Sequence, residues 1–540
     1  VRQCPAKEII MTTEELLPLP IGNSSFEALR DADQIYVDKT ALVYELARKR
    51  EKFFLTRPRR FGKSLLVSTF ASLFSHGLKY FSGLAIEKLW IDKTYNVVEI
   101  DFSEIKNFTS LEDFESQFKT LLIDSFKEQG FVFQPTQEGD WLQQIAVWLK
   151  KLPLNSLVLL IDEYDSPQTA ALDNKELFVA VRKRLASFYA KVKSNDGCLR
   201  FMFITGIAKF NQTGIFSEFN TFTDISLIST FGALLGYTED DLDRYFSGYL
   251  AQAATVLKTS ETEVRRQLRD HYDGFCFEET ASQHVYAPWS VLNFLSWPFR
   301  GFFNYWMGSG GQSTALQKYL HTHAIRSPED YGEEQTLRLE QLSASTDYDV
   351  LSDVVLLTQS GYFTIKRRNG RYLSVGFPNQ EVSDTFAELY TDLLLKQQTF
   401  EDVGAGRLQE AVLTGNADLL FEAANHAFAA IDYQRYPIRE EKHCQAYLQI
   451  FIFGGGFDVS PENHSALGRS DLEIRTQKFR WILELKYLKT GSGTAEALLQ
   501  KAVAQMQDRR YGAASDRRLI RVAAVFSEEK RAFVRWQQVE

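Results

Sequence analysis

The sequence predicts a multidomain α/β protein with a parallel sheet in its first half and a smaller α/β domain at its C-terminal end. Three observations support this fold class. A chain of 540 residues is too long for one hydrophobic core, so about two to four domains are expected. The apolar run LVLLI at residues 157–161 is typical of a strand buried on both faces of a parallel sheet. Residues 439–540 alternate helix-like and strand-like segments, as in a compact α/β domain.

The composition is that of a folded globular protein. Apolar residues make up 44% of the chain and charged residues 24%. The 61 basic and 70 acidic residues give a net charge of −9, so any contact with nucleic acid is expected to be local. The four cysteines form no CxxC pair, which argues against a zinc site or a disulfide framework. Without a long apolar run or a secretion signal, we expect a cytoplasmic protein that makes no membrane contact.

A strand, a loop and a helix near residue 60 predict a phosphate-binding site. The apolar run KFFLT precedes the loop RPRRFGKS, and the stretch LLVSTFASLF that follows has helical periodicity. The triplet Gly62-Lys63-Ser64 is the second half of the P-loop pattern GxxxxGK[ST], in which backbone N–H groups at a helix N-terminus surround phosphates. The lysine of this pattern reaches the outer phosphates and the hydroxyl binds Mg²⁺. The expected nucleotide contacts are Arg57, Pro58, Arg59, Arg60, Phe61, Gly62, Lys63, Ser64 and Leu65.

Arg57 replaces the first glycine of that pattern. A glycine at this position normally permits a tight turn, so residues 57–60 are expected to form a loop of a different shape. A GKS triplet alone is also compatible with a surface loop that happens to precede a helix. The two interpretations have equal weight until a second motif is considered.

The second motif is a strand that ends in two carboxylates, LVLLIDE at residues 157–163. Ligands of open α/β sheets bind at the C-terminal ends of the strands, which is where Asp162 and Glu163 are expected. We expect Asp162 to hold Mg²⁺ through water and Glu163 to polarise the attacking water. A strand that simply ends in solvated acids is the alternative. The order of the two motifs favours a site for ATP and Mg²⁺, with Ser64 and Asp162 on the metal.

Two further strands are expected at residues 96–101 and 199–206. A strand that intervenes between the P-loop strand and the Asp-Glu strand is typical of the ATPase branch that includes AAA+ and STAND proteins. Thr205, at the tip of the second of these strands, is then a candidate sensor of the terminal phosphate. A strand-end cap explains Thr205 equally well.

The middle of the chain predicts a helical lid followed by a basic hairpin. TEDDLDRYFSGYL and ETEVRRQLRDHYDG have the periodicity of helices that would cover the nucleotide. Residues 350–376 predict a helix and two strands, with Asn369-Gly370 as the hairpin turn. This order suits a winged helix, whose tip would contact DNA phosphates. An exposed, arginine-rich turn is the alternative and the commoner explanation. The basic residues at the tip are Lys366, Arg367, Arg368 and Arg371.

Residues 439–540 predict the order αβββαβ, which is the core order of PD-(D/E)XK nucleases. Asp471 lies near the start of the second strand, and Glu484 and Lys486 share one face of the third. We expect Asp471 and Glu484 to bind Mg²⁺ and Lys486 to position or activate the attacking water. Charged positions in a strand often mark only its solvent face, but this strand is otherwise apolar, so unpaired charges on a buried face would be costly. Further candidates are Gln505 for catalysis and Glu441 and Glu462 for the metal.

Seven segments in this order resemble a family of bacterial proteins. They are LPIGNSSFEALR, IYVDKT, RPRRFGKSLL, LLIDEYDSP, FITGIAKF, YDGFCF and SVGFPNQEV. From about Leu17 to its end, the chain is similar to AAA-ATPase-like proteins that carry a C-terminal PD-(D/E)XK domain. In that family an arginine is usual at the first loop position, and the resemblance implies nucleotide binding without implying efficient turnover. It also implies that IYVDKT, residues 35–40, lines a base or ribose pocket, although an N-cap at Asp38 explains the same letters.

The sequence therefore predicts five segments. These are an N-terminal extension at 1–16, of which 1–10 receive no function, a P-loop AAA-ATPase-like domain at 17–236, a helical lid at 237–330, a winged-helix region at 331–390, and a helical linker with a nuclease-like domain at 391–540. We expect ATP to control a Mg²⁺-dependent nuclease that prefers DNA to RNA and acts in a homo-oligomer, in defence against foreign nucleic acid. The alternative is a STAND-like signalling or scaffold ATPase whose C-terminal fold binds nucleic acid or protein without cleavage.

Overall fold

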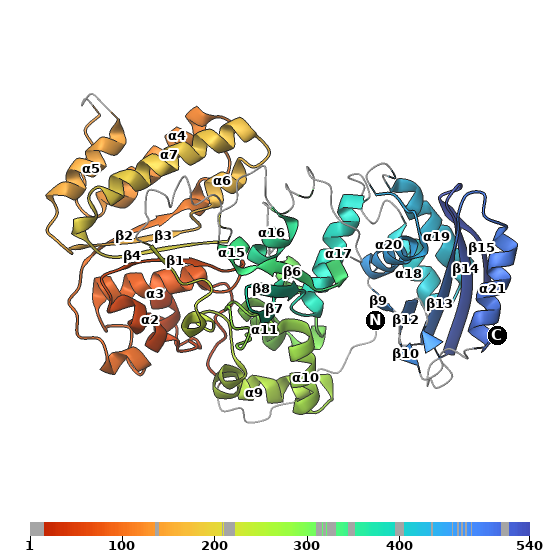
Figure 1. Ribbon diagram of the computed structural model, residues 1–540. Coiled ribbons are helices and arrows are strands. Elements are labelled where there is room, and N and C mark those ends of the chain that lie inside the picture. The colour runs from red at the N-terminus through yellow and green to blue at the C-terminus, as the bar shows by residue number, and fades with distance from the viewer. Residues whose placement is uncertain are drawn as a thin grey trace, which may run out of the picture. The chain divides into compact units, whose positions relative to one another are not determined.

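The computed structural model divides the chain into two compact units, which are coloured by position in the chain in Figure 1. The N-terminal unit comprises Val1–Ala315 and Leu337–Glu381, and the C-terminal unit comprises Leu316–Thr336 and Val382–Glu540. The structure describes residues 16–135, 140–207, 209, 222–308, 316, 320, 331–343, 352–394, 404–431, 433, 436–455, 457–461, 464–465, 468–469, 472–476, 478–508 and 518–539. Among the helices in these ranges, none combines the length and apolar content that crossing a bilayer requires.

A five-stranded parallel sheet forms the centre of the N-terminal unit. Its strand order is β2-β3-β4-β1-β5, and every neighbouring pair is parallel. The strands are β1 (Lys52–Thr56), β2 (Asn96–Asp101), β3 (Leu157–Asp162), β4 (Leu199–Gly206) and β5 (Phe222–Asp224). Both β3 and β4 are buried along their whole length, as expected for strands covered on both faces. The strand between β1 and β3 is β4, whereas β2, which lies between the two motifs in sequence, is at the edge.

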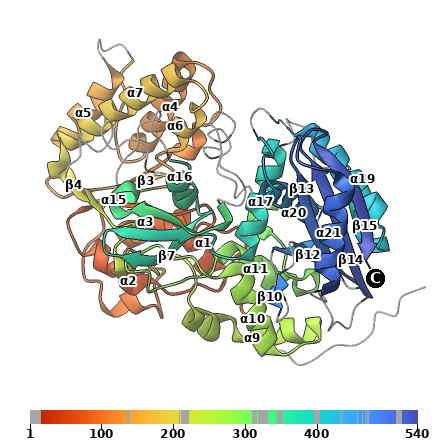
Figure 2. The same ribbon diagram turned by 45° about the vertical axis from the view of Figure 1, so that its right-hand side comes forward.

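Helices cover both faces of this sheet (Figures 1 and 2). On one face lie α2 (Thr40–Ala47) and α3 (Lys63–His76), and on the other α4 (Leu111–Lys127), α5 (Trp141–Lys151), α6 (Ser166–Ala170) and α7 (Lys175–Lys193). Asp140 and Asn174 cap α5 and α7 with their side chains. By contrast, α3 begins after Gly62 at a φ of 90° and has no side-chain cap. Its first N–H groups are therefore not occupied by a capping side chain, which suits a helix start that binds an anion.

Three longer helices form one core with the N-terminal segment. These are α9 (Glu239–Leu257), α10 (Glu261–Tyr272) and α11 (Pro288–Ser296), and their apolar faces pack with Ile35 and Val37. Other short helices described in this unit are α1 (Phe26–Asp31), η1 (Ala85–Lys88), η2 (Phe102–Glu104), η3 (Asp196–Cys198), η4 (Ser229–Phe231), η5 (Pro298–Arg300) and α12 (Tyr305–Gly308). The predicted lid helices thus share their core with the segment ahead of the phosphate loop.

A small three-stranded sheet has the order β6-β8-β7. Its strands are β6 (Gln335–Arg338), β7 (Thr364–Asn369) and β8 (Tyr372–Gly376), and two helices precede the hairpin, α15 (Leu339–Ser343) and α16 (Asp353–Ser360). The antiparallel β7–β8 hairpin is the one that Asn369-Gly370 predicts. Its arginines have acidic partners, because Arg368 lies 3.2 Å from Glu279 and Arg371 lies 3.6 Å from Glu340. The winged-helix interpretation, with this tip on DNA, stays a prediction.

The C-terminal unit contains a second five-stranded sheet with the order β15-β14-β13-β12-β9. Its strands are β9 (Asp458–Pro461), β12 (Leu472–Arg475), β13 (Phe479–Leu488), β14 (Arg518–Ser527) and β15 (Ala532–Val539). Only β13 and β14 pair in parallel. On one face lies α21 (Ala495–Asp508), and on the other α18 (Ala405–Thr414), α19 (Ala417–Ala430) and α20 (Glu441–Gly454) (Figure 2). The remaining elements are α17 (Gln380–Leu394), β10 (His464–Ser465) and β11 (Gly468–Arg469).

Candidate nucleotide and nuclease sites

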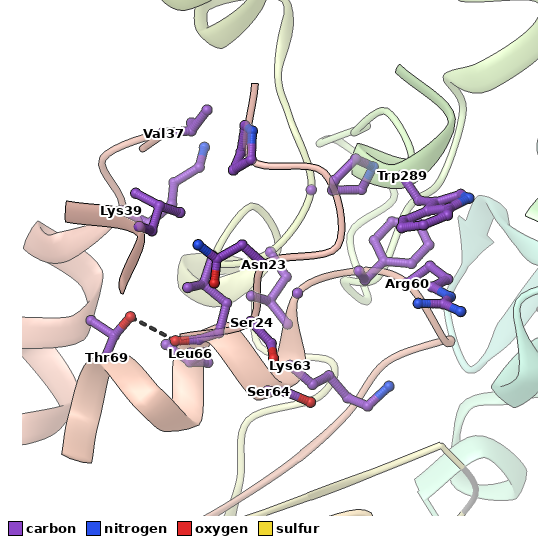
Figure 3. Close-up of a pocket in the computed structure, with 18 of the residues that line it drawn as sticks. Asn23, Ser24, Val37, Lys39, Arg60, Lys63, Ser64, Leu66, Thr69 and Trp289 are labelled. Carbon is purple, nitrogen blue, oxygen red and sulfur yellow. Dashed lines mark hydrogen bonds between the residues drawn. The ribbon is translucent and has the colours of Figure 1, made fainter. Parts of the chain in front are cut away.

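A cavity of about 550 Å³ lies beside the start of α3 (Figure 3). Its volume is in the ordinary range for a small-molecule site. Three parts of the N-terminal unit form its walls, namely residues 20–43, the loop and first turns of α3 at 59–69, and lid residues at 234–237 and 288–292. Five basic residues line it, Lys39, Arg59, Arg60, Lys63 and Lys106, against one acidic residue, Glu163. The charge of the walls therefore suits a polyanion.

Residues 57–62 are here called the phosphate loop. Residues 59–62 of this loop and the first turn of α3 form the polar end of the cavity. Lys63 is 6% exposed, and its Nζ donates to the carbonyls of Arg57 at 3.0 Å and Pro58 at 2.9 Å. Burial lowers the pKa of Lys63. An ammonium held by loop carbonyls at a helix N-terminus can exchange these acceptors for phosphate oxygens, which are stronger partners.

Ser64 and Asp162 meet next to this lysine. The Ser64 hydroxyl donates to Asp162 Oδ2 at 2.6 Å, and burial raises the pKa of Asp162. A hydroxyl and a carboxylate are oxygen ligands of the kind that Mg²⁺ prefers. Glu163 follows in the left-handed region, at a φ of 46°, and lines the cavity. The donor set of the site therefore fits a nucleotide with Mg²⁺.

Arg57 directs its side chain away from the cavity lining. The guanidinium donates to the carbonyls of Thr56, Ser226 and Phe231 at 2.8 to 3.1 Å. It also lies over the ring of Phe277, with Cζ 4.6 Å from the ring centre. Burial lowers the pKa of Arg57 to about 9. The side chain thus ties the loop to neighbouring segments, and any nucleotide contact of residue 57 would come from its backbone.

The structure brings most of the predicted nucleotide contacts to one cavity. The residues that line it are Arg59, Arg60, Phe61, Gly62, Lys63, Ser64, Leu65 and Glu163. The lining does not include Arg57, Pro58, Asp162 or Thr205. Thr205 is fully buried, and its hydroxyl has no hydrogen-bond partner among the described residues. Its sensor role stays a prediction.

Residues 35–40 lie at the start of α2 and along the cavity. The N-cap of α2 is Lys39 rather than the expected Asp38, and a contact with a base or ribose stays a prediction. The Asp38 carboxylate accepts from the backbone N–H and the hydroxyl of Thr40, at 2.8 and 2.6 Å, at the start of α2. Tyr36, Val37 and Lys39 line the cavity. Lys39 is also paired with Asp241 in the first turn of α9, at 2.5 Å. One short segment therefore starts a helix and forms a wall of the cavity.

Trp289 is a cavity residue that the sequence did not reveal. It lies in the first turn of α11, and its indole N–H donates to the carbonyl of Tyr305 at 3.1 Å. The pair Pro288-Trp289 has the proline expected at a helix start, but this signal says nothing about what the helix faces. Lys106 was missed for a similar reason, since a single lysine in a loop after a strand carries no pattern.

In the C-terminal unit, Glu484 and Lys486 lie on the same side of β13. The Glu484 side chain is fully buried, and Lys486 Nζ lies 3.0 Å from its Oε1. Lys486 Nζ also lies 3.4 Å from Glu441 Oε1 at the start of α20, and donates to the carbonyl of Leu485 at 2.8 Å. Lys486 is thus placed between two carboxylates in a partly buried setting. The structure therefore places the predicted pair Glu484 and Lys486 next to Glu441, which the sequence offered as a further metal ligand.

The rest of the predicted nuclease set is not brought together. Asp471 and Glu462 lie outside the described residues. Within the described ranges, no group of three or more His, Cys, Asp or Glu residues is arranged to hold a metal ion. Gln505 is half-buried on α21, and its catalytic role stays a prediction. Glu484 and Glu441 are the described oxygen donors next to Lys486, and carboxylates of this kind suit Mg²⁺.

Comparison with known proteins divides the chain in the same way. Residues 20–216 match the family described as predicted AAA-ATPase, and residues 439–536 match the PD-(D/E)XK nuclease superfamily. An uncharacterised protein in the vnfD 5′ region of Azotobacter chroococcum mcd 1 is 28% identical over 508 residues. That alignment covers 91% of this chain and 92% of the relative. An alignment of this length has to include parts of both matched regions of this chain.

Two solved structures also match, with low scores. The ORC2 protein of Aeropyrum pernix, in ADPNP and ADP complexes, has 14% identity and a TM-score of 0.23, over 83% of this chain and 90% of that chain. Cdc6p of Pyrobaculum aerophilum has 13% identity and a TM-score of 0.21, over 64% and 87%. At these scores neither match bears on the arrangement of the two units.

Proposed function

Because the chain combines a predicted AAA-ATPase domain with a PD-(D/E)XK nuclease superfamily domain, we propose that ATP binding controls a metal-dependent DNA nuclease within it. The observation that carries the nucleotide half is the cavity, in which Lys63 and four other basic residues face one carboxylate. A triphosphate carries about four negative charges near neutral pH and would use this excess of positive charge. The cavity is also large enough for a base and ribose next to its polar end.

Each residue at the polar end has one role in this proposal. Lys63 exchanges its carbonyl partners for the outer phosphates, and Ser64 and Asp162 hold Mg²⁺. When bound, Mg²⁺ neutralises part of the phosphate charge. Glu163, which lines the cavity beside Ser64, orients and polarises the attacking water. The buried, carbonyl-bonded state of Lys63 supports this assignment, because only a strong acceptor repays the loss of those bonds.

Titration calorimetry on the full-length chain tests the nucleotide assignment. Lys63→Ala is expected to weaken the binding of Mg-ATP by about tenfold or more, since a charge-assisted phosphate contact is lost. Glu163→Gln is expected to bind Mg-ATP normally and to slow its turnover by about a hundredfold. Equal affinity in Lys63→Ala and the unchanged protein would remove the nucleotide claim. Undiminished turnover in Glu163→Gln would remove Glu163 from its role while leaving binding intact.

The observation that carries the nuclease half is the Glu484–Lys486 pair in a strand of a PD-(D/E)XK domain. In this proposal Glu484 and Asp471 hold Mg²⁺, and Lys486 positions the attacking water and stabilises the charge that develops on the phosphate. Glu441, 3.4 Å from Lys486, keeps the ammonium in place. Gln505 remains a candidate catalytic residue, but the roles proposed for Glu484, Asp471 and Lys486 do not depend on it.

A cleavage assay on plasmid DNA, single-stranded DNA and RNA tests the nuclease assignment. With Mg²⁺ present, Glu484→Gln is expected to abolish cleavage, because the isosteric amide cannot act as an anionic metal ligand. Glu496→Gln, in an exposed carboxylate of α21, is the matched control and should cut normally. DNA is expected to be cut faster than RNA. Absence of any cleavage that depends on Glu484 would remove the nuclease claim.

A scaffold or signalling ATPase is the second candidate, and one observation favours it. Lys486 is held between Glu484 and Glu441, so acidic side chains of the protein itself engage its charge. A PD-(D/E)XK fold in this state would bind nucleic acid or protein without cutting it. Calorimetry with Mn²⁺ separates the two, since a nuclease should bind the ion in its C-terminal domain and lose that binding in Asp471→Ala.

The biological setting belongs to the same proposal. We expect a homo-oligomer in the bacterial cytoplasm that cuts foreign nucleic acid. Light scattering with and without ATP would reveal the oligomer. Plaque counts on cells that carry the unchanged chain or Glu484→Gln would test the defensive role, with equal counts arguing against it.

A further inference from the structure

Arg60 has an unusual position in the phosphate loop. Its backbone lies in the left-handed region, at a φ of 67°, which is unfavourable for a residue other than glycine. Its guanidinium lies over the indole of Trp289, with Cζ 4.5 Å from the ring centre (Figure 3). Both residues line the nucleotide cavity. A strained backbone that holds a charged group at the wall of a site is typical of a functional position.

The indole of Trp289 is a fixed surface. Its N–H donates to the carbonyl of Tyr305 at 3.1 Å. The next residue, Ser290, donates to Oε2 of the fully buried Glu381 at 2.7 Å, and the backbone N–H of Trp306 donates to Oε1 of the same carboxyl at 2.9 Å. These hydrogen bonds fix the first turn of α11 and, with it, the position of the indole. Arg60 is exposed, so in this contact the arginine is the partner that can move.

Arg60 also lies close to the reacting end of the proposed nucleotide. Glu163, the residue assigned to the attacking water, lines the same cavity as Arg60. Lys63, assigned to the outer phosphates, belongs to the same cavity lining. A planar guanidinium binds phosphate through two parallel hydrogen bonds, which is a stronger contact than one with an exposed aromatic face. The terminal phosphate of a triphosphate would therefore compete successfully with Trp289 for Arg60.

We propose that Arg60 is the residue that distinguishes ATP from ADP, by exchanging the face of Trp289 for the terminal phosphate. This inference rests on the proposed nucleotide site and specifies how that site recognises the number of phosphates. A diphosphate held by Lys63 and Ser64 leaves Arg60 on the indole. A triphosphate draws it away, so the contact between the phosphate loop and α11 reports which nucleotide is bound.

The exchange predicts opposite effects for its two partners. Arg60→Ala removes the phosphate contact and should lower the ratio of ATP affinity to ADP affinity by about tenfold. Trp289→Leu removes the contact that ATP must displace and should raise the same ratio by about threefold. Any loss of base or ribose contacts at Trp289 cancels in the ratio, because both nucleotides share them. The double variant should match Arg60→Ala, since the indole matters only when the arginine is present.

Titration calorimetry with Mg²⁺ and either ADP or a non-hydrolysable ATP analogue measures these ratios on the full-length chain. Arg60→Lys keeps the charge without the planar fork and should lie between Arg60→Ala and the unchanged protein. Arg48→Ala is the control, because Arg48 is an exposed residue paired with Glu45 outside the cavity lining, and its ratio should not change. If Arg60→Ala fails to fold, Arg60→Gln removes the charge with a side chain of similar length.

Tryptophan fluorescence gives a second measure that does not depend on turnover. The ATP analogue should change the emission and ADP should change it less, and Trp289→Phe should abolish the difference. An unchanged affinity ratio in Arg60→Ala would overturn the inference. The inference would also be overturned if Trp289→Leu lowered the ratio of ATP affinity to ADP affinity as much as Arg60→Ala does. That result would mean that the intact Arg60–Trp289 contact favours ATP binding. Unchanged ATP affinity in Lys63→Ala would instead overturn the proposed nucleotide site, so the two failures are distinguishable.

Discussion

Arg57 occupies the position at which P-loops usually have a glycine, and its side chain contributes to the shape of the loop. The guanidinium bonds three backbone carbonyls, from β1 and from the segment that follows β5, and lies over Phe277. The Phe231 carbonyl also accepts from the backbone N–H of Leu234 at 3.2 Å, but loss of a charged donor to buried carbonyls is costly. The arginine therefore sets the shape of the loop from the side opposite the nucleotide.

Restoring glycine at position 57 should accordingly destabilise the protein. Arg57→Gly is expected to lower the free energy of unfolding by about 4 kcal/mol, because three buried carbonyls lose a charged donor. Urea titration of the full-length chain measures this loss. Arg57→Lys should recover only a small part of it, since one ammonium cannot reach all three acceptors. A glycine variant as stable as the unchanged protein would contradict the assignment of Arg57 as a structural tie.

Glu381 is a buried carboxyl whose protonation should show in the pH dependence of stability. Burial raises its pKa to about 8, from an ordinary value of 4.5, despite hydrogen bonds from Ser290 and the Trp306 backbone. Between these two values the folded protein holds a proton that the unfolded chain has released. The contribution of this group to the free energy of unfolding therefore falls as pH rises through that window, by about 1.4 kcal/mol per pH unit.

Glu381→Gln should remove that dependence, because the amide stays neutral and can still bond both partners. We expect the variant and the unchanged protein to unfold at similar urea concentrations near pH 5 and the variant to be the more stable near pH 8. Glu112→Gln, in an exposed residue at the start of α4, is the control and should show no such divergence. Parallel stability curves for Glu381→Gln and the unchanged protein would contradict a raised pKa.

Single residues were predictable where a motif fixes their chemistry. Lys63, Ser64 and Glu163 line the cavity as the two nucleotide motifs predict. The direction of the Arg57 side chain was not predictable, because its partners Ser226 and Phe231 are about 170 residues away in sequence. Trp289 was missed for the same physical reason, since a cavity wall built by a distant helix leaves no local signal.

Among the elements, the end of α16 and α12 lie against the phosphate loop. Gly361 ends α16 at a φ of 88°, and a Cβ at this position would lie 2.5 Å from Cγ of Pro58. The indole N–H of Trp306 donates to the carbonyl of Arg59 at 3.4 Å. The region predicted as a winged helix therefore packs against the phosphate loop. A shift of either one should displace the other, because the two are in direct contact.

Gly361→Ala tests this support. The added methyl group has to displace Pro58, so we expect both lower stability and an ATP affinity reduced by about tenfold. Gly370→Ala is a close control, because Gly370 also has a positive φ, of 62°, but a Cβ there meets nothing within 4 Å. That variant should lose about 1 kcal/mol of stability and bind ATP normally. Equal ATP affinity in the two alanine variants would argue against the contact between α16 and the loop.

The core elements were easier to predict than the peripheral ones. An apolar run such as that of β3 allows little besides a buried strand, and the order αβββαβ was visible at the C-terminal end. The strand β15 was missed because it alternates buried and exposed residues at a sheet edge. The position of β4 between β1 and β3 follows from pairing between distant segments, which local periodicity does not encode.

At the scale of the whole molecule, the two proposed sites belong to different units. The cavity lining lies wholly in the N-terminal unit, and Glu441, Glu484 and Lys486 lie in the C-terminal unit. Glu381, which holds α11 behind the cavity, is the last residue of the N-terminal unit and lies in the first turn of α17. The presence of two domains of different families was predictable from two independent motifs. Their coupling has no sequence signature, because it depends on how a change at the cavity is passed along the chain or through assembly.

The most direct test of coupling is the rate of DNA cleavage by the full-length chain with Mg²⁺, measured with and without ATP. We expect ATP to change the rate in the unchanged protein, Lys63→Ala to keep cleavage but lose the response to ATP, and Glu484→Gln to abolish cleavage under every condition. Cleavage that depends on Glu484 but is the same with and without ATP, in both the unchanged protein and Lys63→Ala, would contradict the proposal that ATP controls the nuclease.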